Sequence, residues 1–527
     1  MTTADSPLLS RANRGDVAIN DVTVRLNPLD DVIIAKVPLL PKTRLVGEGE
    51  EITIAQMIPP GHKVAVHAIA QGQPVRRYGQ TIGFATRDIA PGQHVHTQNL
   101  EVHQGELELD YGFSENVIPV EYVPEVERRT FMGYRRADGR VGTRNFVALL
   151  ASVNCSSTAV RRVADHFRDN PILDQYPNVD GVIAFPTKGG CGAHYGSDYL
   201  GLLQTTMAGI VDHPNIGGYV IVSLGCETNQ PDDLIEYGHL DGHRPKVLTI
   251  QEDGGFLKTV EAGIAAVMEL LPEANKVQRE PVPASELVVA LQCGGSDGWS
   301  GVTANPALGE ASDLIVRQGG TVVLGETSEV YGGEHLLTRR AVTPEVGQKL
   351  VDKIHWWEDY TSMHGASIDN NPSPGNKLGG LTTIYEKSLG AIAKSGTTPM
   401  VDVLDYAERI TKRGFLHMDT PGYDPVSATG QVAGGCNIVV FTTGRGSAFG
   451  FKPAPSIKVA TNSTLFAKQE PDMDINAGRM LDGLTLQEMG QEIFDEILAV
   501  ASGKQSKSEA AGIGEEEFNP WIIGATL

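Results

Sequence analysis

The pattern of apolar and polar positions changes once along the chain, near residue 130. Before that point, residues 20–105 read as short apolar runs such as DVIIAKV and HKVAVHAIA, separated by Gly and Pro. This pattern predicts a small all-β module without a long helix. Residues 106–130 are acidic, contain Pro and show no sustained period, so we expect an extended linker there.

After residue 130, apolar runs alternate with helical stretches, which is typical of parallel strands joined by crossover helices. The first series predicts an α/β domain over residues 131–284, and ELVVALQ opens a second one over 285–527. Periodicity predicts helices near 157–168, 197–212, 306–318, 344–360 and 378–393 and a last one ending at Gly503, with strands near 399–404, 437–442 and 456–460.

Length and charge narrow the class of protein. A chain of 527 residues exceeds one hydrophobic core, and 43 Lys and Arg against 65 Asp and Glu give a net charge of −22. Such acidity disfavours nucleic acid or an anionic membrane as a partner. The first residues lack the apolar stretch of an export signal, and no apolar run is long enough to span a bilayer. We expect a cytoplasmic protein that acts on a small molecule, with a homodimer as an open alternative.

Cysteine placement is the strongest candidate for chemistry. Cys155, Cys191 and Cys226 each follow an apolar strand, and Cys293 follows the next one. Because ligands collect at the carboxyl ends of strands in open α/β folds, these thiolates could converge on one metal ion or iron–sulfur cluster. The alternative is that each cysteine packs as a small apolar side chain, which is the role we assign to Cys436.

The β module adds a turn, PPGHK, that presents His62 beside Lys63. A neutral histidine can ligate a metal or act as a general base, and a lysine can bind a carboxylate or take a proton. His94 and His96 lie on one strand face, but with no third ligand in view we expect them to be structural.

Basic and polar loops form a second group of candidates. Arginine forks bind carboxylates, while Asn and Thr suit the hydroxyls of a polyol. No intact GxGxxG or GxxxxGKS motif follows a strand, so a nucleotide enzyme is disfavoured. Each loop is also compatible with ordinary turn chemistry. The candidate substrate-binding residues are Arg144, Asn145, Asn376, Lys377, Thr443 and Arg445.

Several long blocks resemble the altronate and galactarate dehydratases, a family of bacterial sugar-acid dehydratases. They include GHKVAVHAIAQGQPVRRYGQTIGFA, GYRRADGRVGTRNF, SLGCETNQ, LQCGGSDGWSGVTANPALG, NNPSPGNKLGGLTTIYEKSLG, FTTGRGS and MDINAG. The resemblance implies an N-terminal β-clip (SAF-like) domain, two Rossmann-like α/β regions and dependence on Fe(II), with Mn(II) or an iron–sulfur cluster as alternatives. It also implies dehydration of D-altronate to 2-dehydro-3-deoxy-D-gluconate, because WWEDY and the carboxyl end resemble the altronate branch.

The resemblance gives the candidate residues roles. Iron held by Cys155, Cys191 and Cys226 would assist departure of a hydroxyl group, and His62 or Lys63 would act as acid or base. One departure from the family pattern is Thr187, where relatives carry a histidine that His194 or Lys188 could replace here.

Three other functions remain to be weighed. Galactarate, or another aldonate or aldarate, is the rival substrate. A non-catalytic sugar-acid sensor is a distant alternative. A metal-free hydrolase is disfavoured because no GxSxG elbow occurs.

Overall fold

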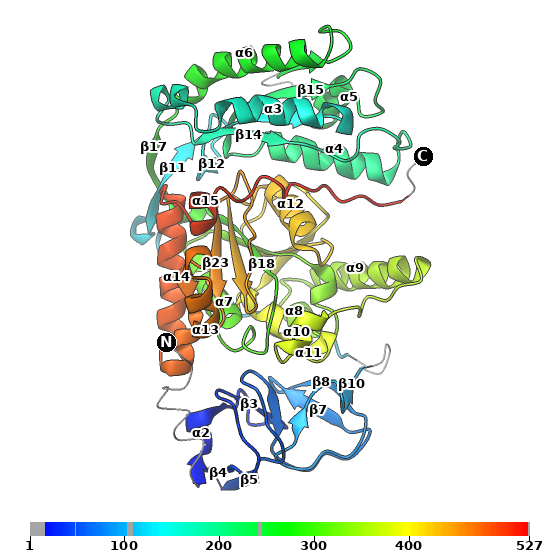
Figure 1. The fold of residues 1–527 in the computed structure, drawn as a ribbon, viewed down its shortest axis with the longest axis vertical. Helices are drawn as coiled ribbons and strands as arrows, with labels where there is room; N and C mark the ends of the chain where they lie inside the picture. Colours follow the sequence, from blue (N-terminus) through cyan, green and yellow to red (C-terminus); the bar gives the residue numbers. More distant parts are fainter. Residues whose placement is uncertain (1–15, 48, 103–108, 241–244, 525–527) are drawn as a thin grey trace.

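The computed structural model describes residues 16–47, 49–102, 109–240 and 245–524. Figure 1 shows three parts along the longest axis, with the β module at one end, the C-terminal α/β body in the centre and the second α/β unit at the other end. None of the helices in the described ranges is long and apolar enough to cross a membrane.

The β module is built from short strands, as the sequence predicts. Its largest sheet has the order β2-β3-β6-β9 and is antiparallel throughout. Two three-stranded sheets, β1-β4-β5 and β10-β8-β7, complete it, and α2 (Ile19–Val22) is its one short helix in the described residues. The strands are β1 (Asp16–Ala18), β2 (Thr23–Val24), β3 (Val32–Ala35), β4 (Arg44–Gly47), β5 (Glu50–Thr53), β6 (Lys63–Ala65), β7 (Pro74–Arg77), β8 (Gln80–Ala85), β9 (His94–Val95) and β10 (Leu100–Glu101).

The second α/β unit is a parallel sheet of four strands in the order β14-β13-β15-β16. Every residue of its central strand, β13 (Phe146–Ala151), is buried, because helices cover both faces. One face packs against α3 and α6, and the other packs against α4. The other elements are β14 (Gly181–Phe185), β15 (Ile216–Ser223), β16 (Lys246–Thr249), α3 (Ser157–Phe167), α4 (Asp198–Val211), α5 (Pro231–Tyr237) and α6 (Phe256–Ala274).

The C-terminal body contains a parallel sheet of seven strands in the order β20-β21-β19-β18-β22-β23-β24. Figure 1 shows α7 and α14 together on one side and α12 on the side of the second unit. The strands are β18 (Val288–Cys293), β19 (Thr321–Leu324), β20 (Met400–Leu404), β21 (Gly414–Met418), β22 (Ile438–Thr443), β23 (Ser456–Ala460) and β24 (Ile475–Asn476). The main helices are α7 (Ala304–Arg317), α9 (Pro344–Met363), α10 (Pro374–Leu378), α11 (Ile384–Ile392), α12 (Asp424–Gly434), α13 (Ser463–Lys468), α14 (Leu486–Ala501) and α15 (Lys507–Ala510).

One predicted helix begins later in the structure than the sequence pattern indicates. The prediction is a helix near 378–393, whereas α11 begins at Ile384, and a break at Gly379 and Gly380 separates it from the short helix α10. Gly380 has a φ of 105°, and a Cβ there would lie 2.5 Å from the carbonyl oxygen of Gly61. The break therefore lets the β module approach the body closely at this point.

The two α/β units are not independent. Phe146 and Leu203 of the second unit share one apolar cluster with Met418 and Val432 of the body. A small antiparallel sheet, β12-β11-β17, joins β11 (Thr130–Arg135) to β12 (Val141–Gly142) and β17 (Arg279–Pro283). The segment after α15 runs between the two units (Figure 1).

Candidate functional site

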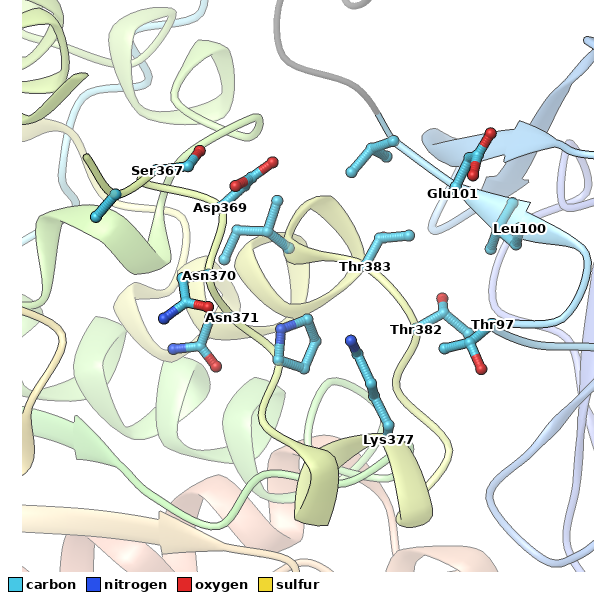
Figure 2. Close-up of a pocket in the computed structure, with 14 residues that line it drawn as sticks. Thr97, Leu100, Glu101, Ser367, Asp369, Asn370, Asn371, Lys377, Thr382 and Thr383 are labelled. Carbon is cyan, nitrogen blue, oxygen red and sulfur yellow. The ribbon is translucent and has the colours of Figure 1, made fainter. Parts of the chain in front are cut away.

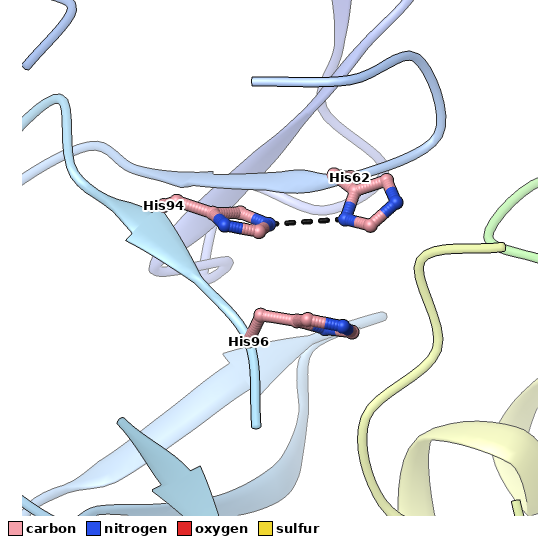
Figure 3. Close-up of side chains that lie close together, drawn as sticks. All are labelled: His62, His94 and His96. Carbon is pink, nitrogen blue, oxygen red and sulfur yellow. Dashed lines mark hydrogen bonds between the residues drawn. The ribbon is translucent and has the colours of Figure 1, made fainter. Parts of the chain in front are cut away.

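Three histidines of the β module meet where it faces the body (Figure 3). His62 Nδ1 lies 3.0 Å from His94 Nε2, and the ring of His96 stacks on that of His94 with centroids 5.2 Å apart. One ligating nitrogen from each ring lies within 4.8 Å of the others. We refer to His62, His94 and His96 as the histidine cluster. We expected His94 and His96 to be structural because the sequence showed no third ligand near them. His62 supplies the third ring, from a turn 32 residues before His94.

The histidine cluster has the properties of a metal-binding group. Burial and the neighbouring His62 lower the pKa of His94 to about 3, and burial and Lys63 lower the pKa of His96 to about 4. Both rings are thus neutral near pH 7, the form that ligates metals. His96 Nδ1 is buried with no hydrogen-bond partner. His62 Nε2 lies 3.3 Å from the Leu378 carbonyl oxygen, so a proton on that nitrogen leaves Nδ1 free to ligate.

A pocket of about 520 Å³ opens between the β module and the loop before α11, and Thr97, the residue after His96, lines it. Figure 2 shows Lys377 pointing into it from α10, with Asp369 on the body side and Glu101 on the β-module side. Within the described residues, the Lys377 ammonium has no hydrogen bond or ion pair, as expected for a group that awaits an anion. The pocket is lined by Thr97, Leu100, Glu101, Val102, Ala366, Ser367, Asp369, Asn370, Asn371, Pro372, Lys377, Thr382, Thr383 and Ile384.

Lys63 does not line this pocket, and its role as an acid or base stays a prediction. Its ammonium is fully buried and donates to the Gly380 carbonyl at 2.7 Å and to both carboxylate oxygens of Glu386 at 2.8 and 2.9 Å. Arg77 donates to the same carboxylate and to the carbonyl oxygen of Gly298. We call Lys63, Arg77 and Glu386 the interdomain ion cluster, since it joins the β module to the body.

Cys293 lies in a second buried group, at the end of β18. Its sulfur accepts a hydrogen bond from Lys394 at 2.9 Å, and Lys387 bridges Glu329 at 2.6 Å and Asn371 of the pocket wall at 3.0 Å. Ligating atoms of Cys293, Glu326 and Glu329 also lie within 4.8 Å of one another. Burial raises the pKa of the Cys293 thiol to about 12, which keeps it protonated. The ammonium groups of Lys394 and Lys387 already bind the Cys293 sulfur and the Glu329 carboxylate, so these two ligand atoms are used within the protein.

The other three predicted cysteine ligands lie elsewhere. Cys155, Cys191 and Cys226 follow β13, β14 and β15, at the carboxyl edge of the four-stranded sheet, and all three are exposed. The close groups of metal-ligating atoms found in the described residues do not include them. The β module docks at the far end of the body from this sheet (Figure 1), so His62 cannot cover a centre held by these thiols. The four cysteines therefore do not form one set, and metal binding by the three exposed ones stays a prediction.

Arg144 and Asn145 are not placed to bind a substrate at that edge. They precede β13, at the amino end of the sheet. Arg144 is buried and pairs with Glu509 at 2.7 and 2.8 Å. The Asn145 amide donates to the carbonyl oxygens of Asn178 and Ala274. The guanidinium of Arg144 does bind a carboxylate, as expected for an arginine fork, but this carboxylate is that of Glu509 and not of a substrate.

Two further loop candidates are also held by the protein. Asn376 completes the capping box of α10 with Ser373 and donates to the Ser296 carbonyl. Thr443 is buried, and its hydroxyl accepts from the Gly446 amide at 3.0 Å. Arg445 differs, because its guanidinium is exposed and makes no hydrogen bond within the described part of the chain. Lys377 and Arg445 are therefore the predicted cations that remain available to an anion.

Sequence reasoning missed the residues of α11. Glu386 and Lys387 lie in IYEKSLGAI, a helix in which all nine residues are buried. Charged residues at fully buried positions must be paired, so the two charges point to partners on other elements. The alternation of charge within an apolar helix could have revealed this, but only if the burial of the whole helix had been known.

The fold places a candidate site for a small polar molecule between the β module and the edge of the α/β body. Family models match three consecutive regions: the altronate/galactarate dehydratase SAF domain over residues 21–103, the second domain of D-galactarate dehydratase/altronate hydrolase over 133–275, and the C-terminal domain of D-galactarate/altronate dehydratase over 284–526. The chain belongs to the altronate/galactarate dehydratase family, and its relatives named altronate dehydratase and galactarate dehydratase are hydro-lyases.

Curated relatives cover nearly the whole chain. Altronate dehydratase of Escherichia coli (strain K12) is 36% identical over 487 residues, which span 92% of this chain and 96% of the relative. Galactarate dehydratase (L-threo-forming) of the same strain is 40% identical over 480 residues, spanning 89% and 91%. Altronate dehydratase of Bacillus subtilis (strain 168) is 35% identical over 483 residues, spanning 91% and 95%. The resemblance read from the sequence blocks is thereby confirmed at the level of the family.

Proposed function

We propose that this chain dehydrates D-altronate to 2-dehydro-3-deoxy-D-gluconate with the aid of Fe(II). The observation that carries the proposal is the pocket lined by Lys377, together with the histidine cluster near it. Thr97, the residue after His96, lines the pocket, and His62 contacts Leu378, the residue after Lys377. Alongside burial, the charge of Lys377 also contributes to the lowered pKa of His96. Relatives named for altronate and for galactarate match the chain to similar degrees, so the choice between the two substrates is argued from the residues that line the pocket.

Charge in the pocket favours a substrate with one carboxylate. Among the described residues, Lys377 is the one cation that lines the pocket, and Asp369 and Glu101 stand on either side of it (Figure 2). A diacid would bring its second carboxylate towards one of these acidic side chains, which costs free energy at short range. The polyol end of an aldonate would instead donate hydroxyl protons to them. Galactarate is the second candidate, because Arg445 offers another free cation nearby.

Dehydration requires loss of the proton next to the carboxylate and departure of the neighbouring hydroxyl group. The Lys377 ammonium would bind the carboxylate and stabilise the negative charge that develops on it when the proton leaves. His62, His94 and His96 would hold Fe(II), which supplies Lewis-acid polarisation of a substrate oxygen when bound. Mn(II) is an alternative ion for three imidazoles and water. The β module and the loop before α11 would shield this space from bulk water.

A substrate panel with metal control tests the proposal. Protein purified without oxygen and reconstituted with Fe(II) should convert altronate to a keto-deoxy acid, and removal of iron with a chelator should abolish turnover. Galactarate and other aldonates and aldarates serve as the comparison set. Faster turnover of galactarate would replace the proposed substrate, and full activity of the chelated protein would refute the metal role.

A further inference from the structure

Glu386 is the hub of the interdomain ion cluster, although it touches neither the pocket nor a histidine ring. Its carboxylate accepts two hydrogen bonds from Lys63, one from Arg77, and two from the amide and hydroxyl of Thr382 at 2.8 and 2.6 Å. Burial alone would raise its pKa, but Lys63 and Arg77 outweigh burial and lower the pKa to about 2. The side chain is thus a permanent anion between two cations of the β module.

This anion fixes the backbone that carries the histidines. Lys63 directly follows His62, and β6 pairs with β9 so that Val64 stands opposite His94. The position of Lys63 therefore sets the positions of two of the three rings. The bond from Lys63 to the Gly380 carbonyl also ties the chain next to Leu378, whose carbonyl oxygen faces His62 Nε2.

We propose that Glu386 is a positioning residue that holds the histidine cluster in its metal-binding arrangement against the body. The inference rests on the proposed function for the metal, and adds that a residue of the C-terminal body controls a site built from the β module. Without the negative charge, Lys63 and Arg77 lose the carboxylate that both bind, and removing one partner of a buried ion pair is strongly destabilising. The turn that carries His62 would then shift away from Leu378, and the three ligating nitrogens would no longer point towards one metal position.

Binding of Co²⁺ to the whole protein is the test, because its visible absorption reports both affinity and geometry. Glu386→Gln keeps the size of the side chain but removes its charge. We expect the folded variant to bind Co²⁺ at least about tenfold more weakly than the wild type, the range found when groups that orient metal ligands are removed. Asp402→Asn is the matched control: Asp402 is also a buried carboxylate bound by two lysines, Lys349 and Lys412, but it lies on β20. Its Co²⁺ affinity should equal that of the wild type.

An unchanged affinity and spectrum in Glu386→Gln would overturn the proposal. If that variant does not fold, Glu386→Asp keeps the charge but shortens the side chain by one methylene, and it should weaken Co²⁺ binding by a smaller factor. Wild-type affinity would again overturn the inference.

Hydrogen exchange provides a readout without metal. Amides of residues 60–66 should exchange faster in Glu386→Gln than in Asp402→Asn, and equal rates would count against a positioning role. Dehydration by the wild type is measured separately. If altronate proves not to be the substrate, the effect of Glu386→Gln on Co²⁺ binding can still be interpreted.

Discussion

At the scale of single residues, the candidate cations differ in whether they already have a carboxylate partner within the protein. Arg144 and Lys63 carry charges that looked available in the sequence, but each is buried against a carboxylate of the same chain. Lys377 is half-buried and has no partner within the described ranges. A free ammonium in a partly desolvated pocket is the more effective anion site, because no internal ion pair must break first.

Replacing Lys377 tests this distinction. In Lys377→Met the substrate carboxylate loses a charge-assisted hydrogen bond, of roughly 1.5–3 kcal/mol. We expect kcat/KM for the preferred sugar acid to fall by about 10- to 100-fold, while the melting temperature stays near that of the wild type. Steady-state kinetics give the answer. Lys276→Met, at an exposed lysine paired with Glu273, should leave kcat/KM unchanged. Wild-type kinetics in Lys377→Met would remove this residue from the site.

The two candidate sets of metal ligands can be told apart by iron content. His94→Ala removes one ring of the histidine cluster and should lower bound iron and turnover to background, since two ligands rarely retain a divalent ion. Cys191→Ser removes an exposed thiol in the other α/β unit and should keep both. Iron would be measured after anaerobic reconstitution. Loss of iron from Cys191→Ser alone would assign the metal to the cysteines, as the sequence pattern first predicted.

At the scale of elements, the junction of α10 and α11 connects the body to the β module. Gly380→Ala would place a methyl group 2.5 Å from the Gly61 carbonyl oxygen, at a φ of 105°. Strain and the clash together should cost more than about 2 kcal/mol of stability. Gly139→Ala is the control, because its φ of 89° is similar but no atom lies within 4 Å of the new Cβ. Thermal unfolding should show a larger loss of stability for Gly380→Ala than for Gly139→Ala. Equal losses would mean that the contact with Gly61 can accommodate the added methyl group.

Periodicity was sufficient to predict most of the elements. The strands near 399–404 and 456–460 and the helices near 157–168 and 344–360 lie within a few residues of β20, β23, α3 and α9. These segments owe their conformation to a local apolar pattern, which the sequence displays directly. The break at Gly379 and Gly380 is different, because its cause is the approach of Gly61, more than 300 residues away in the chain.

The site was predicted less well for the same reason. His62 and Lys377 were singled out from the turns that carry them, and both lie at the interface. The three rings of the histidine cluster and the partners of Lys63 come from segments that only tertiary structure brings together. Spacing along the chain suggested that four cysteines converge, but strand ends of two separate sheets do not share an edge.

At the scale of the whole molecule, two histidines buried outside the site should make the protein sensitive to acid. Burial lowers the pKa of His213 and of His417 to about 3. Above pH 6.5 both are neutral in the folded and unfolded states. Below it only the unfolded state takes up protons, so stability falls until the pH reaches the folded pKa. Between pH 7 and pH 5 each should cost about 2 kcal/mol.

Substitution of His213 isolates this contribution from those of the carboxyl groups. A glutamine keeps a donor for the Cys436 carbonyl, which His213 Nε2 approaches to 3.0 Å, but it does not titrate. His213→Gln should therefore lose less stability than the wild type between pH 7 and pH 5, measured as the shift in the midpoint of urea unfolding. An identical shift in both proteins would show that His213 does not stay neutral in the fold.

The segment after α14 has a consequence for how the chain is made. Arg144 becomes buried against Glu509, and Phe185 packs on Phe518, so the second α/β unit is completed by residues synthesised more than 300 positions later. Domains commonly fold in order as they leave the ribosome. Arg144 has no carboxylate partner in this unit until Glu509 has been synthesised. A nascent chain stalled before residue 509 would thus lack both Glu509 and Phe518, so Arg144 and Phe185 would stay without these contacts until the later segment is made.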